Sequence, residues 1–400
     1  MRFLVHRATR SGGHTRVTVT VALAAPARTG SKAWFRSTHR ACAPDDTWAR
    51  IAPLLRHAGI TRVGDVTRLD GVGVATVQAI RPQSHSLAVT MASGVTTQLA
   101  RVAAAMAALE LWHAEQVPHP PYWASLGEVR ASLGYNPESL RLHRPNLLND
   151  GMVLDWVPAM VLATGRTTMV PRALVEHDLR VREEWSPPVF VASRDGLAAG
   201  NTNAEAVLHG LLEVVARDCA ARAHVAGAAA RLDPATVDSD DARRILDRLA
   251  AAGVTVTVHD VTGPTEIAAF EVALRAPGMP EVRAAACHLD REVALCRALC
   301  AAARERLARI LGARDDLPLD ALGPQAAPHD APLADAPAVR RWRDVPTVAG
   351  STFAGDIAEV AERVRRGGAG PVLVVDLSRP DAGVAVARVV VPGLLGGAAR

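Results

Sequence analysis

Residues 203–222 carry acidic and imidazole side chains at a spacing that could support chemistry. Glu205, His209 and Glu213 stand in an otherwise apolar run. Because an α-helix turns about 100° per residue, Glu205 and Glu213 lie about 80° apart around the axis, with His209 between them. Ala216 falls on the same side, where a third acid could stand. A buried carboxylate is costly unless a cation, a metal ion or hydrogen bonds compensate it, so this face needs a partner.

A second helical segment supplies a further acid. The helix expected at residues 97–115 is apolar nearly all round, and Glu110 stands in its middle. Two such helices could bring their carboxylates together on a hard cation such as Mg²⁺. The alternative is an exposed or ion-paired acid: Arg217 follows Glu213 by four residues, which is the favourable order for a local ion pair. The spacing alone leaves both interpretations open.

Other combinations of reactive residues give weaker signals. Cys287, His288, Cys296 and Cys300 could be taken as a zinc set, but they lack a tight CxxC pair, and cysteines often serve as core residues. The sequence contains no GxGxxG, Walker lysine or GxSxG pattern. Histidines on the apolar helices could act as general bases or could be core residues held by hydrogen bonds.

The elements that must position these residues alternate irregularly, which predicts a mixed α/β (α+β) fold. Helices are expected over residues 43–60, 94–116, 203–222, 239–253 and 289–313. Strands are expected within 62–84, 188–193, 254–261, 265–287, 370–377 and 386–393. Residues 194–201 are expected to form a loop. Asp45 or Asp46 is the candidate cap of the first helix, and Thr96 or Thr97 that of the second.

The domain organisation is expected to be simple. Residues 1–30 form an N-terminal segment of the mature chain, because the alternation in VTVTVAL suits a strand better than an export signal. Residues 31–400 form the main domain, with 317–338 as a linker or surface loop rich in Pro and Ala.

Composition excludes several classes of protein. The net charge is only +4 and no segment holds a dense basic run, so nucleic-acid binding is not indicated. The longest apolar runs, such as 102–109, are much shorter than a membrane span. Five cysteines without a CxxC pair are typical of free thiols, which favours a cytoplasmic location.

Several collinear blocks resemble the YcaO family, from about residue 32 to 395. They include STHRACAPDD, RPQSHSLAV, AALELWHAE, GLAAGNTNAEAVLHGLLEVVARD, CHLDREVALCRALCAAARERLARILGARDD and RVVVPGL. The LELWHAE form and the VPGL ending resemble the subgroup found with TfuA proteins. The PxPxP tail of many azoline-forming members is missing.

The resemblance implies a YcaO-type fold that binds ATP and Mg²⁺ between acid-bearing helices. Such proteins phosphorylate a peptide amide oxygen, and attack by a nucleophile then gives an azoline, thioamide or amidine. By resemblance, the Mg²⁺ ligands are Glu110, Glu205 and Glu213. The nucleotide contacts are Asn201, Arg217, Arg304 and Arg306.

The sequence departs from the family at several of these positions. Ala107 and Ala216 stand where the family has glutamates. Ala92-Ser93-Gly94 replaces a glycine-lysine-glycine stretch, and Ala301 and Arg304 replace an acid and a glutamine. Asp195 replaces an asparagine. These losses predict a degenerate site with little affinity for the metal-bound triphosphate.

We therefore expect a partner or scaffold subunit of a complete YcaO enzyme that matures ribosomally made peptides. Its expected partners are that enzyme, a TfuA-like protein or both, together with the precursor peptide, in a homodimer or heteromer. The alternative is an active ATP-dependent enzyme with a rearranged site, in which Arg304 replaces metal charge. A nucleotide sensor that binds ADP is a third hypothesis.

Overall fold

The computed structural model describes residues 32–181, 188–227, 229–312, 314, 339–348 and 350–394. The predicted N-terminal segment (1–30) and the loop at 317–338 lie outside these residues and stay predictions.

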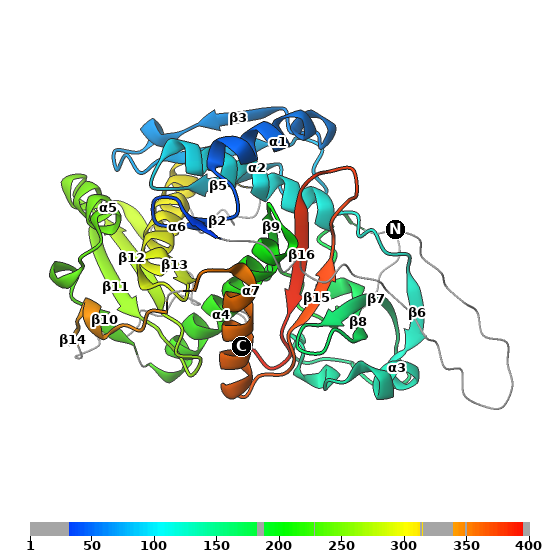
Figure 1. Ribbon diagram of the computed structural model, residues 1–400. Helices are drawn as coiled ribbons and strands as arrows, with labels where there is room; N and C mark the ends of the chain where they lie inside the picture. Colours follow the sequence, from blue (N-terminus) through cyan, green and yellow to red (C-terminus); the bar gives the residue numbers. More distant parts are fainter. Residues whose placement is uncertain are drawn as a thin grey trace, which may run out of the picture.

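The described residues form seven α-helices and four β-sheets, which confirms the mixed fold (Figure 1). The helices are α1 (Pro44–His57), α2 (Thr97–Ala114), α3 (Leu126–Leu133), α4 (Asn203–Ala226), α5 (Asp240–Ala251), α6 (Arg291–Leu311) and α7 (Phe353–Arg366). Two small sheets consist of the hairpin β1 (Ala33–Trp34) and β2 (His39–Arg40), and of β3 (Arg62–Asp65), β4 (Thr76–Ile80) and β5 (Val89–Ser93).

Two larger sheets complete the fold. One has the order β13-β12-β11-β10-β14, with β10 (Ala230–Leu232), β11 (Thr255–Asp260), β12 (Ala269–Ala276), β13 (Met279–Cys287) and β14 (Val339–Arg340). The other has the order β6-β7-β15-β16-β9, and β8 also pairs with β7. Its strands are β6 (Tyr122–Ser125), β7 (Val153–Val161), β8 (Thr167–Pro171), β9 (Leu197–Gly200), β15 (Leu373–Asp376) and β16 (Ala385–Val390).

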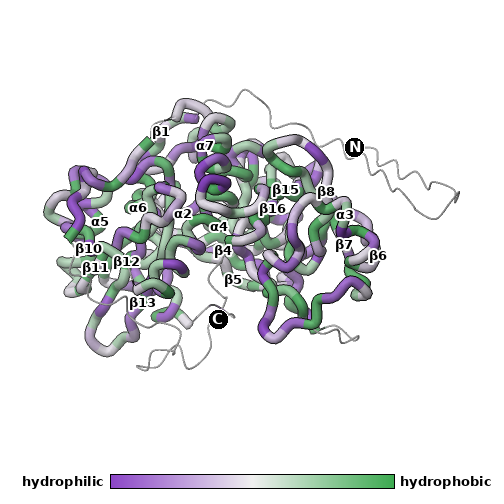
Figure 2. The backbone as a smooth tube through the Cα atoms, turned by 90° about the horizontal axis from the view of Figure 1, so that it is seen from below, coloured by the Kyte–Doolittle hydropathy of each residue, from purple (hydrophilic) through white to green (hydrophobic). Residues whose placement is uncertain are grey.

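Helix α4 lies between the two larger sheets, as Figures 1 and 2 show from two directions. It packs on β9 and β16 on one side and on β12 and β13 on the other. The hydroxyl of Thr202 caps its start by accepting from the Glu205 amide, and Gly227 ends it in the left-handed conformation. Because apolar residues cover nearly all of its circumference, α4 is a core helix. Glu205 and Asp218 are therefore buried, and Glu213 is partly buried.

Glycines allow α4 to approach the sheet closely. A Cβ atom at Gly210 would lie 2.6 Å from the Gly196 carbonyl oxygen, and one at Gly200 would lie 2.6 Å from the Ala206 amide nitrogen. Contacts of this length are far inside van der Waals distance, so a side chain at either position would push the helix away from β9 and β16.

Helix α7 is tied to the start of the described chain by a buried ion pair. Lys32 Nζ donates to Asp356 Oδ2 at 2.5 Å, and the two side chains are 3% and 2% exposed. The backbone amide of Lys32 also donates to the Ser351 carbonyl oxygen. This pair fixes the segment that leads into the β1–β2 hairpin.

Three local predictions were wrong, including the cap of the first helix at Asp45 or Asp46. Residues 188–193 form only an isolated bridge between Phe190 and Leu142, whereas the expected loop 194–201 contains β9. Strand β9 reads LAAG and has no β-branched residue, so its strand conformation follows from pairing with β16. Helix α1 begins at Pro44 without a side-chain cap, while Thr96 caps α2 as predicted.

Candidate functional site

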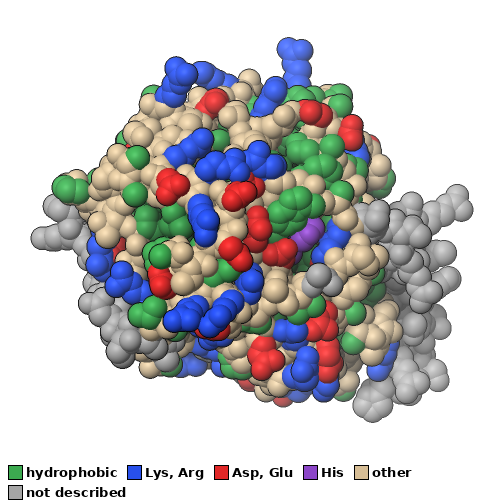
Figure 3. All heavy atoms as spheres, turned by 60° about the vertical axis from the view of Figure 1, so that its left-hand side comes forward, with side chains coloured by type: hydrophobic (Ala, Val, Ile, Leu, Met, Phe, Trp, Pro, Cys, Tyr) green, Lys and Arg blue, Asp and Glu red, His purple; other side chains and the backbone are tan. Residues whose placement is uncertain are grey.

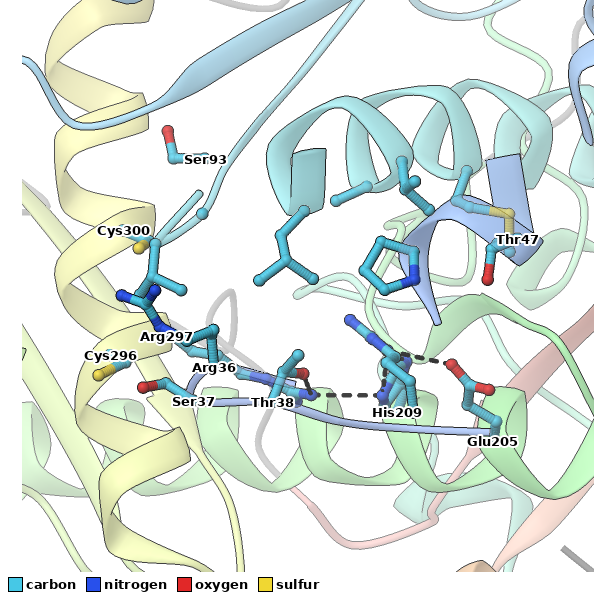
Figure 4. Close-up of a pocket in the computed structure, with 18 of the residues that line it drawn as sticks. Arg36, Ser37, Thr38, Thr47, Ser93, Glu205, His209, Cys296, Arg297 and Cys300 are labelled. Carbon is cyan, nitrogen blue, oxygen red and sulfur yellow. Dashed lines mark hydrogen bonds and ion pairs between the residues drawn. The ribbon is translucent and has the colours of Figure 1, made fainter. Parts of the chain in front are cut away.

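A cavity of about 210 Å³ opens where α2, α4 and α6 approach the β1–β2 hairpin and the end of β5 (Figure 4). The charged and imidazole side chains that line it are Arg36, Arg40, Glu110, Glu205, His209 and Arg297. Three guanidinium groups therefore face two carboxyl groups and one imidazole.

Glu205 is only 2% exposed, and both of its carboxylate oxygens accept hydrogen bonds from the chain itself. Arg40 Nη1 lies 3.3 Å from Oε1. The backbone amides of Ala41 and Asn201 donate to Oε2 at 3.2 and 3.3 Å, and Asn201 Nδ2 does so at 3.2 Å. Thr47 donates to Asn201 Oδ1 at 2.9 Å, which fixes the amide. A guanidinium and three N–H groups thus compensate this buried charge.

His209 lies one turn further along α4, between two guanidinium groups. Arg40 Nη1 approaches its Nε2 atom to 2.6 Å, and Arg297 Nη2 approaches the same atom to 3.3 Å. Burial and the positive charges of Arg40 and Arg297 hold the pKa of His209 well below its usual value. The imidazole is therefore neutral at physiological pH and available as an acceptor.

Arg297 extends from α6 into the cavity toward Thr38 and His209 (Figure 4). Burial lowers the pKa of Arg297 to about 9, so the guanidinium stays charged at neutral pH. Arg36 and Ser37 form the tip of the hairpin with φ angles of 44° and 59°, a strained conformation for residues other than glycine. Arg36 Nη2 lies 2.7 Å from Asp241 Oδ1 at the start of α5, which holds this tip against the cavity.

Glu110 lies on α2, and its Oε1 atom accepts from the Ala199 amide of β9 at 2.9 Å. Burial raises the pKa of Glu110 to about 8, with the Glu213 charge adding to the shift. The carboxyl group is therefore mostly protonated at neutral pH. Its hydrogen-bond donor comes from a strand and not from a facing helix.

Glu213 does not line this cavity. Burial raises the pKa of its carboxyl group, with the Asp195 charge adding to the effect and Arg217, Arg194 and Arg388 opposing it. Arg217 Nε lies 3.4 Å from Asp195 Oδ1, so the local pair predicted between Glu213 and Arg217 gives way to a pair with Asp195.

The two predicted nucleotide contacts on α6 form ion pairs outside the cavity. Arg304 Nη2 donates to Glu305 Oε1 at 2.9 Å, and Arg306 Nε donates to Asp70 Oδ2 at 2.9 Å. The structure thus brings Glu110, Asn201 and Glu205 to one cavity, and it places Glu213, Arg217, Arg304 and Arg306 away from its walls. The functional assignment of these residues stays a prediction.

The side chains as placed do not fit the magnesium set that the resemblance implies. Within the described ranges, no three His, Cys, Asp or Glu side chains converge in a way that could hold a metal ion. Ala216 is packed into the core around α4. Ser93 and Ala301 line the cavity where the resemblance predicts a lysine and an acid. The cavity fits an anionic ligand better, because guanidinium groups recognise phosphates and carboxylates without a metal.

Sequence analysis did not single out Arg40 and Arg297, although a signal for Arg297 exists. The residues one turn before and after it on α6 are Val293, Ala294, Cys300 and Ala301, all apolar. A lone guanidinium in the apolar face of a helix requires a buried counter-charge or acceptor. Arg40 gives no comparable signal, because only the fold brings β2 beside α4.

The outer surface shows no strong charge bias on the face in Figure 3, where basic and acidic side chains are interleaved. No helix among the described residues is long and apolar enough to cross a membrane.

Comparison with known sequences gives relatives over most of the chain. Residues 91–395 match the family described as YcaO cyclodehydratase, ATP- and Mg²⁺-binding. An uncharacterized protein of Mycobacterium tuberculosis is 36% identical over 376 residues, which cover 90% of this chain and 83% of the relative. An uncharacterized protein of the tfuA 3′ region of Rhizobium leguminosarum bv. trifolii is 33% identical over 375 residues, covering 89% and 88%.

Solved structures share the fold at low sequence identity. A heterocyclase in complex with substrate and cofactor aligns with a TM-score of 0.76 and 19% identity over 92% of this chain, but the alignment spans only 54% of that larger protein. YcaO from Methanopyrus kandleri bound with AMPPCP and Mg²⁺ gives 0.67 and 21% over 92% and 95% of the two chains. The E. coli microcin synthetase McbBCD complex with pro-MccB17 bound gives 0.58 and 14% over 82% and 87%.

The family match covers well over half of the sequence, and it includes the three helices that enclose the cavity. The chain therefore belongs to the YcaO family.

Proposed function

We propose that this chain is a degenerate YcaO subunit in the maturation of a ribosomally made peptide, and that a complete YcaO partner performs the ATP-dependent amide modification. In that reaction the amide oxygen is phosphorylated, a nucleophile attacks the amide carbon, and phosphate leaves. The chain proposed here supports the partner and holds an anionic group of the nucleotide or peptide in its own cavity.

The observation that carries the proposal is the state of the Glu205 carboxylate. Its two oxygens accept from Arg40, Ala41 and Asn201, so the chain supplies the compensation that a metal ion would otherwise give. Mg²⁺ prefers several oxygen ligands in near-octahedral geometry. Removing Arg40 from Glu205 to admit the ion would leave this guanidinium facing His209 and Arg297 without its carboxylate.

The charge of the cavity supports binding of an anion. Arg36, Arg40 and Arg297 line it, while Glu110 is mostly protonated at neutral pH. Guanidinium groups bind phosphate or carboxylate oxygens through charge-assisted hydrogen bonds. This arrangement is consistent with a nucleotide held without phosphoryl transfer.

A partner role is consistent with the known relatives. The microcin synthetase that shares the fold is a multi-subunit complex with its precursor bound, and the Rhizobium relative belongs to a tfuA region. A symmetric interface between family members can diverge into a heteromer that keeps the same contacts. A complete YcaO protein or a TfuA-like protein is therefore the expected partner, with the precursor peptide as the third component.

The alternative function is an active ATP-dependent YcaO enzyme. One observation favours it: the cavity is open, and Glu110, Asn201 and Glu205 all lie on its walls. Arg304 would not replace the lost metal charge in such an enzyme as it is placed, because it pairs with Glu305. Arg40 and Arg297 would take that role.

Reconstitution separates the two functions. The chain is coexpressed with the complete YcaO protein of the same organism, and size-exclusion chromatography measures complex formation. Precursor peptide is then incubated with ATP and either chain or both, and mass spectrometry measures modification. We expect product only when both chains are present. Product from this chain alone would establish the enzyme, and equal rates from the partner alone would remove the proposed role.

Calorimetry tests the cavity itself. We expect the isolated chain to bind Mg·ATP more weakly than about 1 µM. ATP without Mg²⁺ should bind at least as well as with it, and Arg297→Gln should weaken this binding about tenfold. Arg365→Gln is the control, because Arg365 lies on the surface of α7 and forms its ion pair with Glu362 of the same helix. Tight binding that requires Mg²⁺ would contradict a ruined metal site.

A further inference from the structure

A second, smaller cavity of about 40 Å³ lies beside α4 at Val214, between β16 and the segment around residues 140 and 191–195. Its walls are mostly aliphatic, and its charged lining residues are Arg141, Asp195 and Arg388. It shares none of its lining residues with the cavity that contains Glu205. One water molecule occupies roughly 10–15 Å³ of cavity volume, so this cavity accommodates a group of a few heavy atoms.

Arg388 is the unusual component of this cavity. It lies in the middle of a strand, β16, and is only 3% exposed. Its Nη2 atom donates to the Ser193 carbonyl oxygen at 2.5 Å. Its Nε and Nη1 atoms are buried and have no hydrogen-bond partner among the residues that the structure describes. Buried N–H groups on a charged side chain are costly when unpaired, so the site as it stands lacks an acceptor.

The nearby acids do not supply that acceptor. Asp195 Oδ2 accepts from Arg141 at 2.5 Å, and Asp195 Oδ1 pairs with Arg217 at 3.4 Å. Glu213 contributes to the field around Arg388, but no hydrogen bond joins the two side chains in the described structure. The cavity therefore carries two guanidinium groups against one carboxylate that is already shared.

We propose that this cavity is a binding site for a compact oxyanion, either a carboxylate or a phosphate, which accepts the free N–H groups of Arg388. The aliphatic walls exclude water and strengthen the charged hydrogen bonds. The site is separate from the Glu205 cavity and does not depend on the proposed function. A carboxylate could belong to a peptide, and a phosphate could be inorganic.

The test uses the full chain with acetate and inorganic phosphate as separate probes, titrated by calorimetry and by NMR of arginine Nε–H groups. We expect saturable binding of one of them, a shift of the Arg388 Nε–H signal, and a loss of affinity of about tenfold or more in Arg388→Gln. Preference between the probes identifies the source of the oxyanion.

Arg388→Gln could destabilise the fold, so a second variant leaves Arg388 in place. Val191→Phe fills the cavity from its partly exposed wall and should abolish the same binding while Arg388 stays buried. Arg297→Gln, in the other cavity, should leave the shift of the Arg388 Nε–H signal unchanged. Equal affinity in wild type, Arg388→Gln and Val191→Phe would overturn the proposal, as would the absence of saturable binding by either probe. Binding lost only in Arg297→Gln would assign the anion to the Glu205 cavity instead.

Discussion

The first turn and the middle of α4 place similar carboxylates in opposite surroundings. Glu205 is surrounded by donors, with Arg40 on one oxygen and the Ala41 and Asn201 amides on the other. Glu213, eight residues later, is partly buried, but the described structure gives it no hydrogen bond, and its nearest basic residue along the helix, Arg217, pairs with Asp195. Burial raises the pKa of Glu213, whereas Glu205 sits in an ion pair.

The difference shows that acids on one helix can have separate electrostatic surroundings. Arg40 pairs with Glu205, whereas Asp195 pairs with Arg217 and Arg141. The charge of Glu205 is balanced by Arg40, whereas no ion pair or hydrogen bond is described for Glu213. Of the carboxylates expected from the resemblance, Glu110 and Glu205 line the larger cavity, whereas Glu213 lines neither cavity.

Replacing Glu205 should give the largest effect. Glu205→Gln leaves Arg40 without its counter-charge and turns an NH₂ group toward the Ala41 and Asn201 donors. We expect the free energy of unfolding to fall by about 3 kcal/mol, since one partner of a buried pair is removed. Urea unfolding at pH 7 measures this, and a loss below about 1 kcal/mol would mean that the donors around Glu205 contribute little.

A substitution that pushes α4 away from the sheet should lower the free energy of unfolding slightly less than Glu205→Gln does. Alanine normally favours a helix over glycine by about 1 kcal/mol. Gly210→Ala nevertheless places a methyl group 2.6 Å from the Gly196 carbonyl oxygen, and we expect a net loss of about 2 kcal/mol. Thermal unfolding followed by circular dichroism provides the measurement. A stabilised variant would show that α4 is not held as closely to the sheet as described.

Glu110 lines the cavity with Glu205, and the Glu213 charge helps to raise its pKa, so its protonation makes stability depend on pH. Its folded pKa of about 8 lies above the unfolded value of 4.5, because burial disfavours the charged form. Its contribution to stability is fully present below about pH 4.5 and is lost as pH rises through 8.

The stability of Glu110→Gln relative to wild type should therefore rise with pH, by about 2 kcal/mol between pH 5.5 and pH 7. Urea midpoints at both pH values provide the comparison. A constant difference between the two proteins would indicate that Glu110 is ionised in the fold, as a metal ligand would be.

Glu213→Gln should have the smallest effect. Because burial already disfavours its charge, the amide should change stability by no more than about 0.5 kcal/mol at pH 7. Product formation in the reconstituted system should also stay nearly the same. Loss of product at unchanged stability would show that this carboxylate takes part in the chemistry.

The long helices could be predicted from sequence because periodicity, caps and end signals agree. Thr96, Ser239 and Asp290 all cap their helices with side-chain oxygens. Strand β9 could not be predicted, since LAAG has no strand propensity and pairs only because β16 arrives from the far end of the chain.

The candidate site could be predicted only where a local sequence pattern marks its residues. Glu205 and Glu110 are recognisable as acids on apolar helices, and both line the cavity. Arg40 enters from a two-residue strand whose position depends on the hairpin, so local pattern carries no signal for it. The exchange of ion-pair partners around Asp195 likewise depends on contacts between residues far apart in sequence, Arg141 and Arg217.

The buried pair of Lys32 and Asp356 has a practical consequence. Lys32 is the only lysine in the chain, and its side chain is 3% exposed. Amine-reactive cross-linkers should therefore find no lysine on the folded surface, so a partner interface must be mapped through carboxylate or arginine chemistry. The same feature makes lysine acylation a specific reporter of one event, the release of the first described segment from α7.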